Sequence, residues 1–262
     1  MNDADGRIAI REIGPIFDIT IDRPEKYNGF TPKMFRELSD AYNAYEDGSD
    51  LRCAVISANG NHFTAGLDLP KMAEHLNDDF IMATEGKIDI FGLRPPYRTK
   101  PVICAVKGIC FTLGIELMLA SDIVIAAKDC RFAQIEVQRG IIPGGGATGR
   151  MVARAGWGNA MKYLLTGEEF DAQTAKSLNF VQEIVPVGEE KTRAIQLAEM
   201  ICESAPLAVQ HTLINARSVK LHGEEAGYQE LGKIQRSLLQ TSDFQEGLKS
   251  FKEKRRPKFS GK

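Results

Sequence analysis

The most constraining feature of the sequence is a glutamate inside a helix that is otherwise apolar on almost every side. Residues 111–120 are good helix formers, and Glu116 lies in the middle of this stretch. A helix that is apolar all round is normally buried. A carboxylate in such a place is unfavourable unless it is paired, hydrogen-bonded or protonated. The residue types leave two interpretations about equally open: a core glutamate bonded to backbone amides, or a functional acid or base.

Short apolar runs before and after this helix predict buried strands. These runs have the length and the β-branched content typical of strands, and they are Ile8–Ile13, Ile16–Ile21, Cys53–Ser57, Pro101–Val106 and Ile123–Ala127. The first two are close enough in sequence to form a hairpin. The others are separated by helical or loop segments. Strand, helix and strand joined by short links predict an α/β fold with a parallel sheet and helical crossovers.

The pattern changes near Pro186, where strands give way to helices. Residues 180–185 form the last strand-like run. We therefore predict an α/β core over residues 1–186, which holds the active site, and a helical part over residues 187–262. The helical part is expected to contain helices at 189–203, 207–221 and 224–240, followed by a last helix that opens on a capping box at Ser242. The polar residues 71–99 are expected to be the most mobile segment.

Composition and charge exclude several classes of function. Charged residues make up 26% of the chain and the net charge is −2, which gives no support for binding nucleic acid or an anionic membrane. Charges at Lys107, Glu116 and Asp122 interrupt the most apolar region, so no run is long enough to span a membrane. Five scattered cysteines without a CxxC pair, and four scattered histidines, show no metal spacing. The N-terminus does not resemble a signal peptide. Together these features predict a cytoplasmic protein with reduced thiols, no metal and no cofactor.

A second carboxylate and a glycine-rich turn follow the buried helix. Glu136 comes shortly before Pro143, which opens the turn Gly144-Gly145-Gly146. Taken alone, Glu136 is more simply a solvated loop charge. Two carboxylates in one pocket could divide the roles of acid and base if their environments separate their pKa values. Their spacing does not show whether they converge.

The glycine turn also satisfies the pattern G-x-G-x-x-G, with Glu168 at about the right distance downstream for a ribose contact. A dinucleotide site needs a strong strand directly before this pattern. Residues 141–143 are too short for such a strand, and Pro143 ends it. We therefore do not expect nucleotide binding here.

Three stretches resemble, in order, the motifs of the crotonase superfamily, which is the enoyl-CoA hydratase/isomerase family. Residues 21–30 (IDRPEKYNGF) are similar to its RPEKxNA turn, and residues 62–69 (HFTAGLDL) to its FxAGxDL loop. Residues 100–146 follow its order of strand, buried helix with a glutamate, strand, second glutamate and PGGG turn. The resemblance covers nearly the whole chain. It implies a spiral of ββα units, with C-terminal helices that pack on neighbouring subunits in a homotrimer or a dimer of trimers.

The resemblance also assigns roles to individual residues. Glu116 and Glu136 align with a catalytic acid–base pair, and the backbone amide of Gly144 would hold the catalytic water. The backbone amides of Leu67 and Leu113 align with an oxyanion hole, which would stabilise negative charge on a thioester oxygen. The family commonly has three glycines where this chain has Thr112-Leu113-Gly114. A side chain at Leu113 is expected to restrict the backbone of this donor.

Further residues are expected to contact the coenzyme A part of a substrate, and they are Lys26, Tyr27, Ala65, Asp68, Phe251 and Lys254. Among the lysines, Lys254 aligns best with a coenzyme A contact in the family. Lys26 and also Lys71 lie about one residue away from such positions. Taken alone, each of these lysines is more simply a solvated side chain.

The activity that the resemblance implies is the addition of water to a 2-enoyl-CoA thioester, with the acyl-CoA as a small-molecule substrate. One alternative is a double-bond isomerase in which Glu136 is the principal proton carrier. Another is an acyl-CoA-binding protein with little turnover, because the side chain at Leu113 would weaken the oxyanion hole. Neither nucleic acid nor a membrane is expected as a partner.

Overall fold

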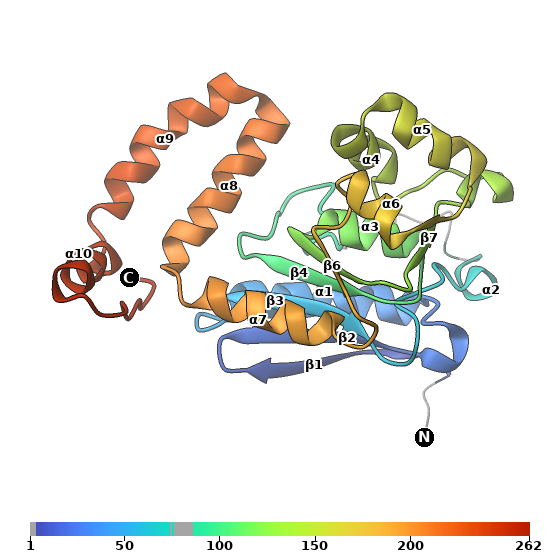
Figure 1. Cartoon of the computed structure of the whole chain (residues 1–262), viewed down its shortest axis with the longest axis horizontal. Helices are drawn as coiled ribbons and strands as arrows, with labels where there is room; N and C mark the ends of the chain where they lie inside the picture. The colour runs from blue at the N-terminus through green and yellow to red at the C-terminus, as the bar shows by residue number, and fades with distance from the viewer. Residues whose placement is uncertain (1–3, 74, 76–85) are drawn as a thin grey trace.

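The computed structural model describes residues 4–73, 75 and 86–262, so much of the segment expected to be most mobile lies outside the described residues. The described part forms a six-stranded sheet in the order β1-β2-β3-β4-β6-β9 (Figure 1). Its strands are β1 (Arg7–Ile13), β2 (Ile16–Asp22), β3 (Cys53–Ala58), β4 (Val102–Val106), β6 (Ile123–Ala127) and β9 (Glu183–Val185). Strands β1 and β2 form the predicted hairpin, and the pairs from β2 to β9 are parallel. The predicted α/β class is confirmed.

A second, smaller sheet was not predicted. It consists of β5 (Ile109–Phe111), β7 (Arg131–Ala133) and β8 (Phe170–Asp171), in the order β5-β7-β8. Strands β5 and β7 are parallel, and Phe111 pairs with Ala133 at their ends. The helix that was expected to begin at Phe111 therefore begins at Leu113, because Phe111 belongs to β5.

Helices cover both faces of the larger sheet. Those of the core are α1 (Pro32–Asp47), α2 (Leu69–Met72), α3 (Leu113–Ala120), α4 (Ala147–Ala155), α5 (Trp157–Thr166) and α6 (Ala172–Ser177). Two short 3₁₀ helices, η1 (Pro24–Lys26) and η3 (Glu136–Arg139), complete this part. The side chain of Thr31 caps the start of helix α1 by accepting a hydrogen bond from the amide of Met34. Pro32 takes the first helical position, where a backbone N–H would have no partner within the helix.

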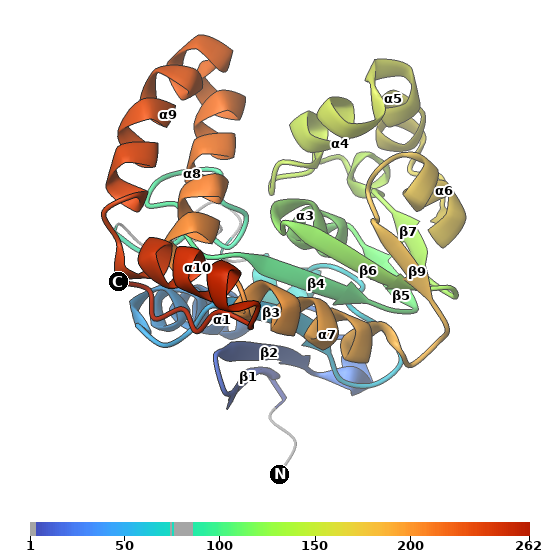
Figure 2. The ribbon, with the colours of Figure 1, turned by 60° about the vertical axis from the view of Figure 1, so that its left-hand side comes forward.

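The C-terminal part is helical, as predicted. It comprises α7 (Glu190–Cys202), α8 (Pro206–His222), α9 (Glu224–Leu238) and α10 (Ser242–Glu253). Helix α7 packs against the sheet through Ala194 and Ala198, whereas α8 and α9 form a hairpin that projects from the core (Figure 2). No residue of α8, all of which is described, is buried. The division near residue 186 and the trimer stay predictions.

Two details of the C-terminal part correct the sequence predictions. The run predicted as the last strand is shorter than expected, since only Glu183–Val185 pair with β6. The cap of α10 is Thr241, whose hydroxyl accepts from the amide of Phe244 at 3.1 Å, and not Ser242. The Ser242 hydroxyl instead donates to the carbonyl of Lys262, so the end of the chain folds back onto the start of α10.

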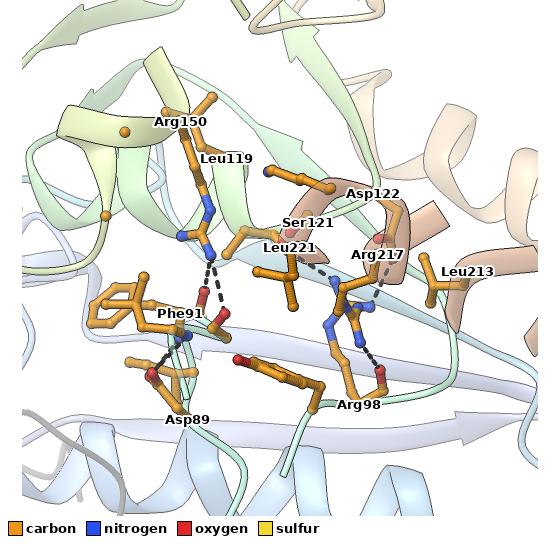
Figure 3. Close-up of a pocket in the computed structure, with 18 of the residues that line it drawn as sticks. Asp89, Phe91, Arg98, Leu119, Ser121, Asp122, Arg150, Leu213, Arg217 and Leu221 are labelled. Atoms are coloured by element: carbon orange, nitrogen blue, oxygen red, sulfur yellow. Dashed lines mark hydrogen bonds and ion pairs between the residues drawn. The ribbon is translucent and has the colours of Figure 1, made fainter. Parts of the chain in front are cut away.

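The hairpin and the core enclose a large cavity of about 760 Å³ (Figure 3). One wall comes from α8, and the opposite walls come from the loop at residues 88–98 and from the ends of α3 and α4. Several charged side chains project into it, including Arg98, Arg150 and Arg217.

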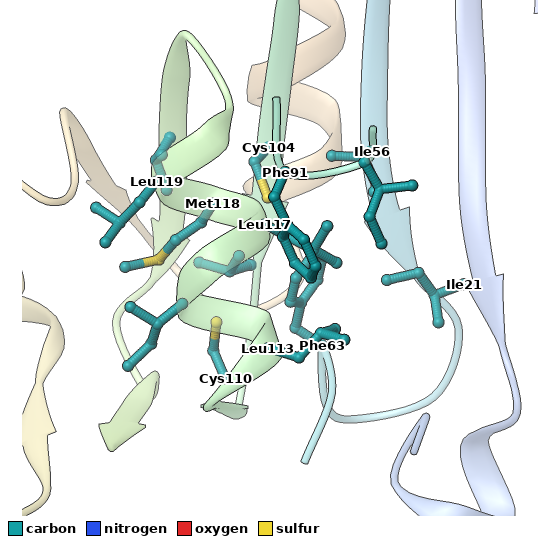
Figure 4. Packing of buried hydrophobic residues seen from close by; sticks show 14 of the residues in the cluster. Ile21, Ile56, Phe63, Phe91, Cys104, Cys110, Leu113, Leu117, Met118 and Leu119 are labelled. Carbon is teal, nitrogen blue, oxygen red and sulfur yellow. The ribbon is translucent and has the colours of Figure 1, made fainter. Parts of the chain in front are cut away.

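The main hydrophobic core is built around α3 (Figure 4). Leu117 and Met118 are almost fully buried among residues of β3, β4 and the loop that follows β3, such as Ile56, Cys104 and Phe63. Burying each large apolar side chain stabilises the fold by about 1.5–3 kcal/mol. Helix α3 is therefore held rigidly. The five cysteines are buried and free, and within the described residues no helix is long and apolar enough to cross a membrane.

Candidate active site

A smaller cavity of about 160 Å³ lies beside the N-terminal half of α3. Its lining is mostly apolar and includes Phe35, Phe91 and Ile142. Both Glu116 and Glu136 line it. The two carboxylates singled out from the sequence therefore share one small pocket.

The small sheet explains how residues twenty positions apart come together. Strand β5 leads into α3 and Glu116, while the parallel strand β7 leads into η3, which Glu136 opens. Because parallel strands end at the same edge of a sheet, the segments that follow them start side by side. The amide of Thr112 donates to the carbonyl of Ala133 at 2.8 Å, which fixes the two starting points to each other.

Glu116 is only 4% exposed, and its carboxylate is held by backbone amides. Its Oε1 accepts from the amide of Gly145 at 2.6 Å and from that of Ala147 at 3.3 Å. Burial raises the pKa of Glu116 to about 7, and the negative charge of Glu136 adds to the rise, while the two amides oppose it. Glu116 is therefore a core residue bonded to amides, as the first interpretation has it, and its role as a functional acid or base stays a prediction.

Glu136 is 8% exposed, so its interpretation as a solvated loop charge is wrong. Burial raises its pKa above the usual range. Its Oε2 is buried and makes no hydrogen bond to any described residue. Such an oxygen is free to bond a substrate or a water molecule.

The glycine turn encloses the carboxylate of Glu116. A Cβ atom at Gly145 would lie 2.7 Å from Glu116 Oε2 and 2.7 Å from the ring of Phe91. Only glycine allows the turn to approach so closely. Helix α4 begins directly after the turn. Among the described residues, the turn is preceded by η3 and a loop and not by a strand. The arrangement agrees with our rejection of a dinucleotide site.

Leu67 and Leu113, the expected oxyanion-hole residues, both line the smaller cavity. Neither backbone amide donates a hydrogen bond to another described residue. Leu113 is the first residue of α3, where amides are unpaired and the helix dipole favours negative charge. The expected backbone restriction does not fall on Leu113: it is Thr112 that adopts the left-handed region, with φ of 49°. The Thr112–Leu113 peptide sets the direction of the Leu113 N–H, so the weakening of this donor stays a prediction.

Gly66 sets the position of Leu67. Its φ is +103°, and a Cβ atom there would lie 2.0 Å from the hydroxyl oxygen of Thr112. Its amide donates to Thr64 Oγ1 at 3.0 Å, and its carbonyl accepts from Phe30 at 2.9 Å. The loop that carries Leu67 is thus packed directly against the start of α3.

The residues expected to bind coenzyme A are only partly gathered here. Ala65 lines the cavity, and its amide donates to the carbonyl of Tyr27 at 2.9 Å. The exposed ring of Tyr27 stacks on His62. Gly144 also lines the cavity, and Lys26 lies in η1, where its side chain is exposed. The coenzyme A role of these residues stays a prediction.

Asp68, Lys71 and the two α10 residues lie in other surroundings. Asp68 pairs with the buried Arg23 at 2.7 Å and caps α2, so its carboxylate is already engaged. Lys71 is paired with Asp5. Phe251 lies on α10 and Lys254 caps its end, and α10 is at the end of the chain opposite α2 (Figure 1). A single chain does not bring these two residues to the cavity, and their role stays a prediction.

Sequence reasoning missed several residues of the site. Phe91 and Arg139 line the cavity, and Arg23 holds Asp68 and the carbonyl of Gly29 beneath it. Phe91 comes from a loop without periodicity, so no pattern could mark it. Arg23 directly follows β2 and lies inside the motif at residues 21–30, which was the one available signal for it. In the described parts of the chain no group of three or more His, Cys, Asp or Glu side chains is placed to bind a metal.

The chain is similar to known proteins over nearly its whole length. Residues 12–262 match the family described as enoyl-CoA hydratase/isomerase. The enoyl-CoA hydratase EchA19 of Mycobacterium tuberculosis is 30% identical over 93% of this chain and 92% of that protein. The mitochondrial Δ(3,5)-Δ(2,4)-dienoyl-CoA isomerase of Dictyostelium discoideum is 27% identical over 93% of this chain and 87% of that protein.

A solved structure extends the comparison to the fold. The crystal structure described as a probable enoyl-CoA hydratase/isomerase from Mycobacterium abscessus is 43% identical and superposes with a TM-score of 0.94. The superposition covers 97% of this chain and 98% of that one. From the α/β core to the C-terminal helices, this chain belongs to the enoyl-CoA hydratase/isomerase family, the crotonase superfamily.

Proposed function

We propose that the protein is an enoyl-CoA hydratase, which adds water across the double bond of a 2-enoyl-CoA thioester. The observation that carries the proposal is the pair of buried carboxylates on one cavity of about 160 Å³, beside two unpaired backbone amides. Acid–base addition of water needs one group to accept a proton and another to supply one. A thioester also needs donors for the charge that builds on its oxygen.

The roles follow from the environment of each group. Glu116 acts as the base on a water molecule that it shares with Glu136, and the water oxygen attacks the β-carbon. Glu136 delivers a proton to the α-carbon, so the product is a 3-hydroxyacyl thioester. The amides of Leu67 and Leu113 stabilise the enolate oxygen, a contribution of roughly 3 kcal/mol each. Gly144 also lines the cavity and supplies a further amide for the water.

The direct test is to add crotonyl-CoA and follow the loss of absorbance of the conjugated thioester. A hydratase removes the conjugation, and the absorbance falls at a rate proportional to protein concentration. If the protein is inert toward 2-enoyl-CoA thioesters of several chain lengths, the proposal is wrong.

The pH dependence of the reaction is expected to report Glu116. A base must be ionised to accept a proton, and burial raises the pKa of Glu116 to about 7. We expect kcat/KM to rise with pH through this value and to fall again at higher pH, where Glu136 loses the proton that it has to supply. Initial rates between pH 5 and 9 measure the profile. A flat profile across neutral pH would contradict the role of Glu116 as the base.

Gly66→Ala is expected to displace the amide of Leu67. The new Cβ would meet the hydroxyl of Thr112 at 2.0 Å, so the loop has to move. Loss of one oxyanion donor lowers kcat roughly a hundredfold or more, and we expect a loss of this order while the fold remains. Measurements are kcat with crotonyl-CoA and Tm.

A matched control separates the displacement from simple backbone strain. Gly188 also has a positive φ, of +89°, but a Cβ there meets nothing within 4 Å. Gly188→Ala should therefore lower stability without lowering kcat. Equal losses of kcat in both variants would argue against the role of Leu67.

The free oxygen of Glu136 also supports a second candidate, a double-bond isomerase. A carboxyl group with an unpaired oxygen can take a proton from one carbon and return it to another. Incubation with a 3-enoyl-CoA in deuterated water distinguishes the two. An isomerase produces a 2-enoyl-CoA that carries deuterium, whereas a hydratase without isomerase activity leaves the 3-enoyl-CoA unchanged.

A further inference from the structure

The large cavity between α8 and the core carries an excess of positive charge. Five cationic side chains line it: Arg98, Arg150 and Arg217, which Figure 3 labels, and also Arg154 and Lys220. The described residues that line it include two carboxylates, Asp89 and Asp122. Three positive charges are therefore left over at the walls of a cavity of about 760 Å³.

Asp122 forms an ion pair with only one of the cations. It pairs with Arg98 at 2.7 Å, and Arg98 directs its other N–H groups to the carbonyls of Lys100 and Ala120. Asp89 accepts hydrogen bonds from two backbone amides, those of Phe91 and Leu93, both at 2.9 Å. Its carboxylate fixes the loop, and no ion pair joins it to a described cation.

The remaining arginines bond to carbonyl oxygens, which satisfy N–H groups without balancing charge. Arg150 donates to the carbonyl of Gly145 at 3.0 Å, and Arg154 donates to that of Leu119 at 3.0 Å. Arg217 donates to the carbonyl of Arg98 at 2.5 Å and lies over the ring of Tyr97. A guanidinium has five N–H donors, so each keeps donors for a ligand.

Lys220 is the fifth of the cations and lies on α8. It lines the cavity with an exposed side chain, and none of the hydrogen bonds or ion pairs within the described part of the chain involves it. Burial lowers the pKa of Lys220, and repulsion from the three arginines lowers it further. Like charges gathered in this way destabilise one another, and an anion among them removes the repulsion.

We propose that this cavity binds a ligand bearing carboxylate or phosphate groups, held by Arg154, Arg217 and Lys220. Arginine donates in pairs to the oxygens of such groups, and lysine adds a compact charge. The three side chains come from two parts of the fold. Arg154 lies on α4 of the core, whereas Arg217 and Lys220 lie on α8 of the hairpin. The ligand therefore bridges the hairpin and the core.

The anionic group has two possible sources. It is either a free anion or the far end of an acyl chain that enters from the smaller cavity. Phe91 lines both cavities, and the glycine turn presents Gly145 to one and Gly146 to the other. An acyl chain that passed Phe91 would bring a terminal carboxylate to the cationic walls. This second source rests on the proposed function.

Calorimetry tests binding without relying on turnover. The full chain is titrated with citrate and, separately, with inorganic phosphate, against chloride at equal ionic strength. We expect saturable binding of at least one of them, and roughly a tenfold or greater weakening in the double variant Arg154→Met, Lys220→Met, which loses two charge-assisted contacts. The single variant Lys220→Met, at an exposed position, serves if the double variant is unstable, and it should also weaken binding.

The matched control removes the same two charges elsewhere. Lys233 and Arg236 lie on α9 and do not line the cavity. The double variant Lys233→Met, Arg236→Met should bind as the wild type does. Equal weakening in both double variants means that net charge alone is responsible, and it overturns the proposal.

A kinetic comparison identifies the source of the anion. Two 2-enoyl-CoA thioesters of equal length are compared, one ending in a carboxylate and one in a methyl group. A preference of roughly tenfold or more in kcat/KM for the carboxylate, lost in Arg154→Met, Lys220→Met, identifies the acyl chain as the source. Binding of citrate or phosphate without such a preference identifies a free anion. If neither binding nor preference depends on Arg154 and Lys220, the proposal is wrong. If neither thioester is hydrated, the proposed function fails and calorimetry alone decides this one.

Discussion

Glu116→Gln is expected to lower the rate of crotonyl-CoA hydration by roughly a hundredfold or more, the usual scale of a general base. Glutamine keeps an oxygen that can accept from the amides of Gly145 and Ala147, so the fold around α3 should persist. The amide side chain has no ionisable group and cannot take a proton from water. The measurement is kcat/KM at pH 8, with Tm as a check on folding.

A matched Glu-to-Gln variant controls for the change of charge. Glu168 is exposed and pairs with Lys162 at 3.5 Å on the surface. Surface pairs of this kind contribute about 0–1 kcal/mol, so Glu168→Gln should leave both Tm and activity nearly unchanged. Full activity in Glu116→Gln would remove the base from the mechanism.

Glu136→Gln is expected to cause a loss of similar size, for a different reason. Its buried Oε2 has no hydrogen-bond partner among the described side chains and backbone, so the substitution breaks no contact of that oxygen. What it removes is the proton for the α-carbon. Because the two carboxylates act as one unit, the double variant should be little slower than either single variant. The rates of all three variants with crotonyl-CoA test this.

The same two variants distinguish the hydratase from the isomerase. If Glu136 is the principal proton carrier of an isomerase, Glu116→Gln should still exchange deuterium into a 3-enoyl-CoA, and Glu136→Gln should not. If both residues serve hydration, both variants lose the addition of water. Hydration that survives in Glu136→Gln would exclude Glu136 as the proton donor.

The sequence predicted much of the fold because the strong patterns agree with the final packing. Long apolar runs became β2, β3, β4 and β6, and the apolar helix became α3. The three-residue strands β5 and β7 were missed, since such short runs carry no periodicity. Yet it is their pairing that places Glu116 beside Glu136. The sequence could therefore identify the two glutamates as candidates. Their spacing along the chain could not show that they line the same cavity.

Other errors have a local physical cause. The start of α3 moved from Phe111 to Leu113, because Phe111 pairs with Ala133 as the last residue of β5. The cap of α10 moved by one residue to Thr241, since the chain end folds back on Ser242. Both cases depend on tertiary pairing, which a local pattern does not contain.

The register of the small sheet has a consequence for how this scaffold can diverge. Side chains alternate from face to face along a strand, so inserting or deleting one residue in β5 or β7 would turn every later side chain of that strand to the opposite side. The spacing between the two acidic groups is thereby locked, although the residues themselves can be exchanged. The chemistry of this framework can therefore change by substituting residues while the lengths of β5 and β7 are kept. Inserted loops are tolerated elsewhere, for example at the tip of the α8–α9 hairpin.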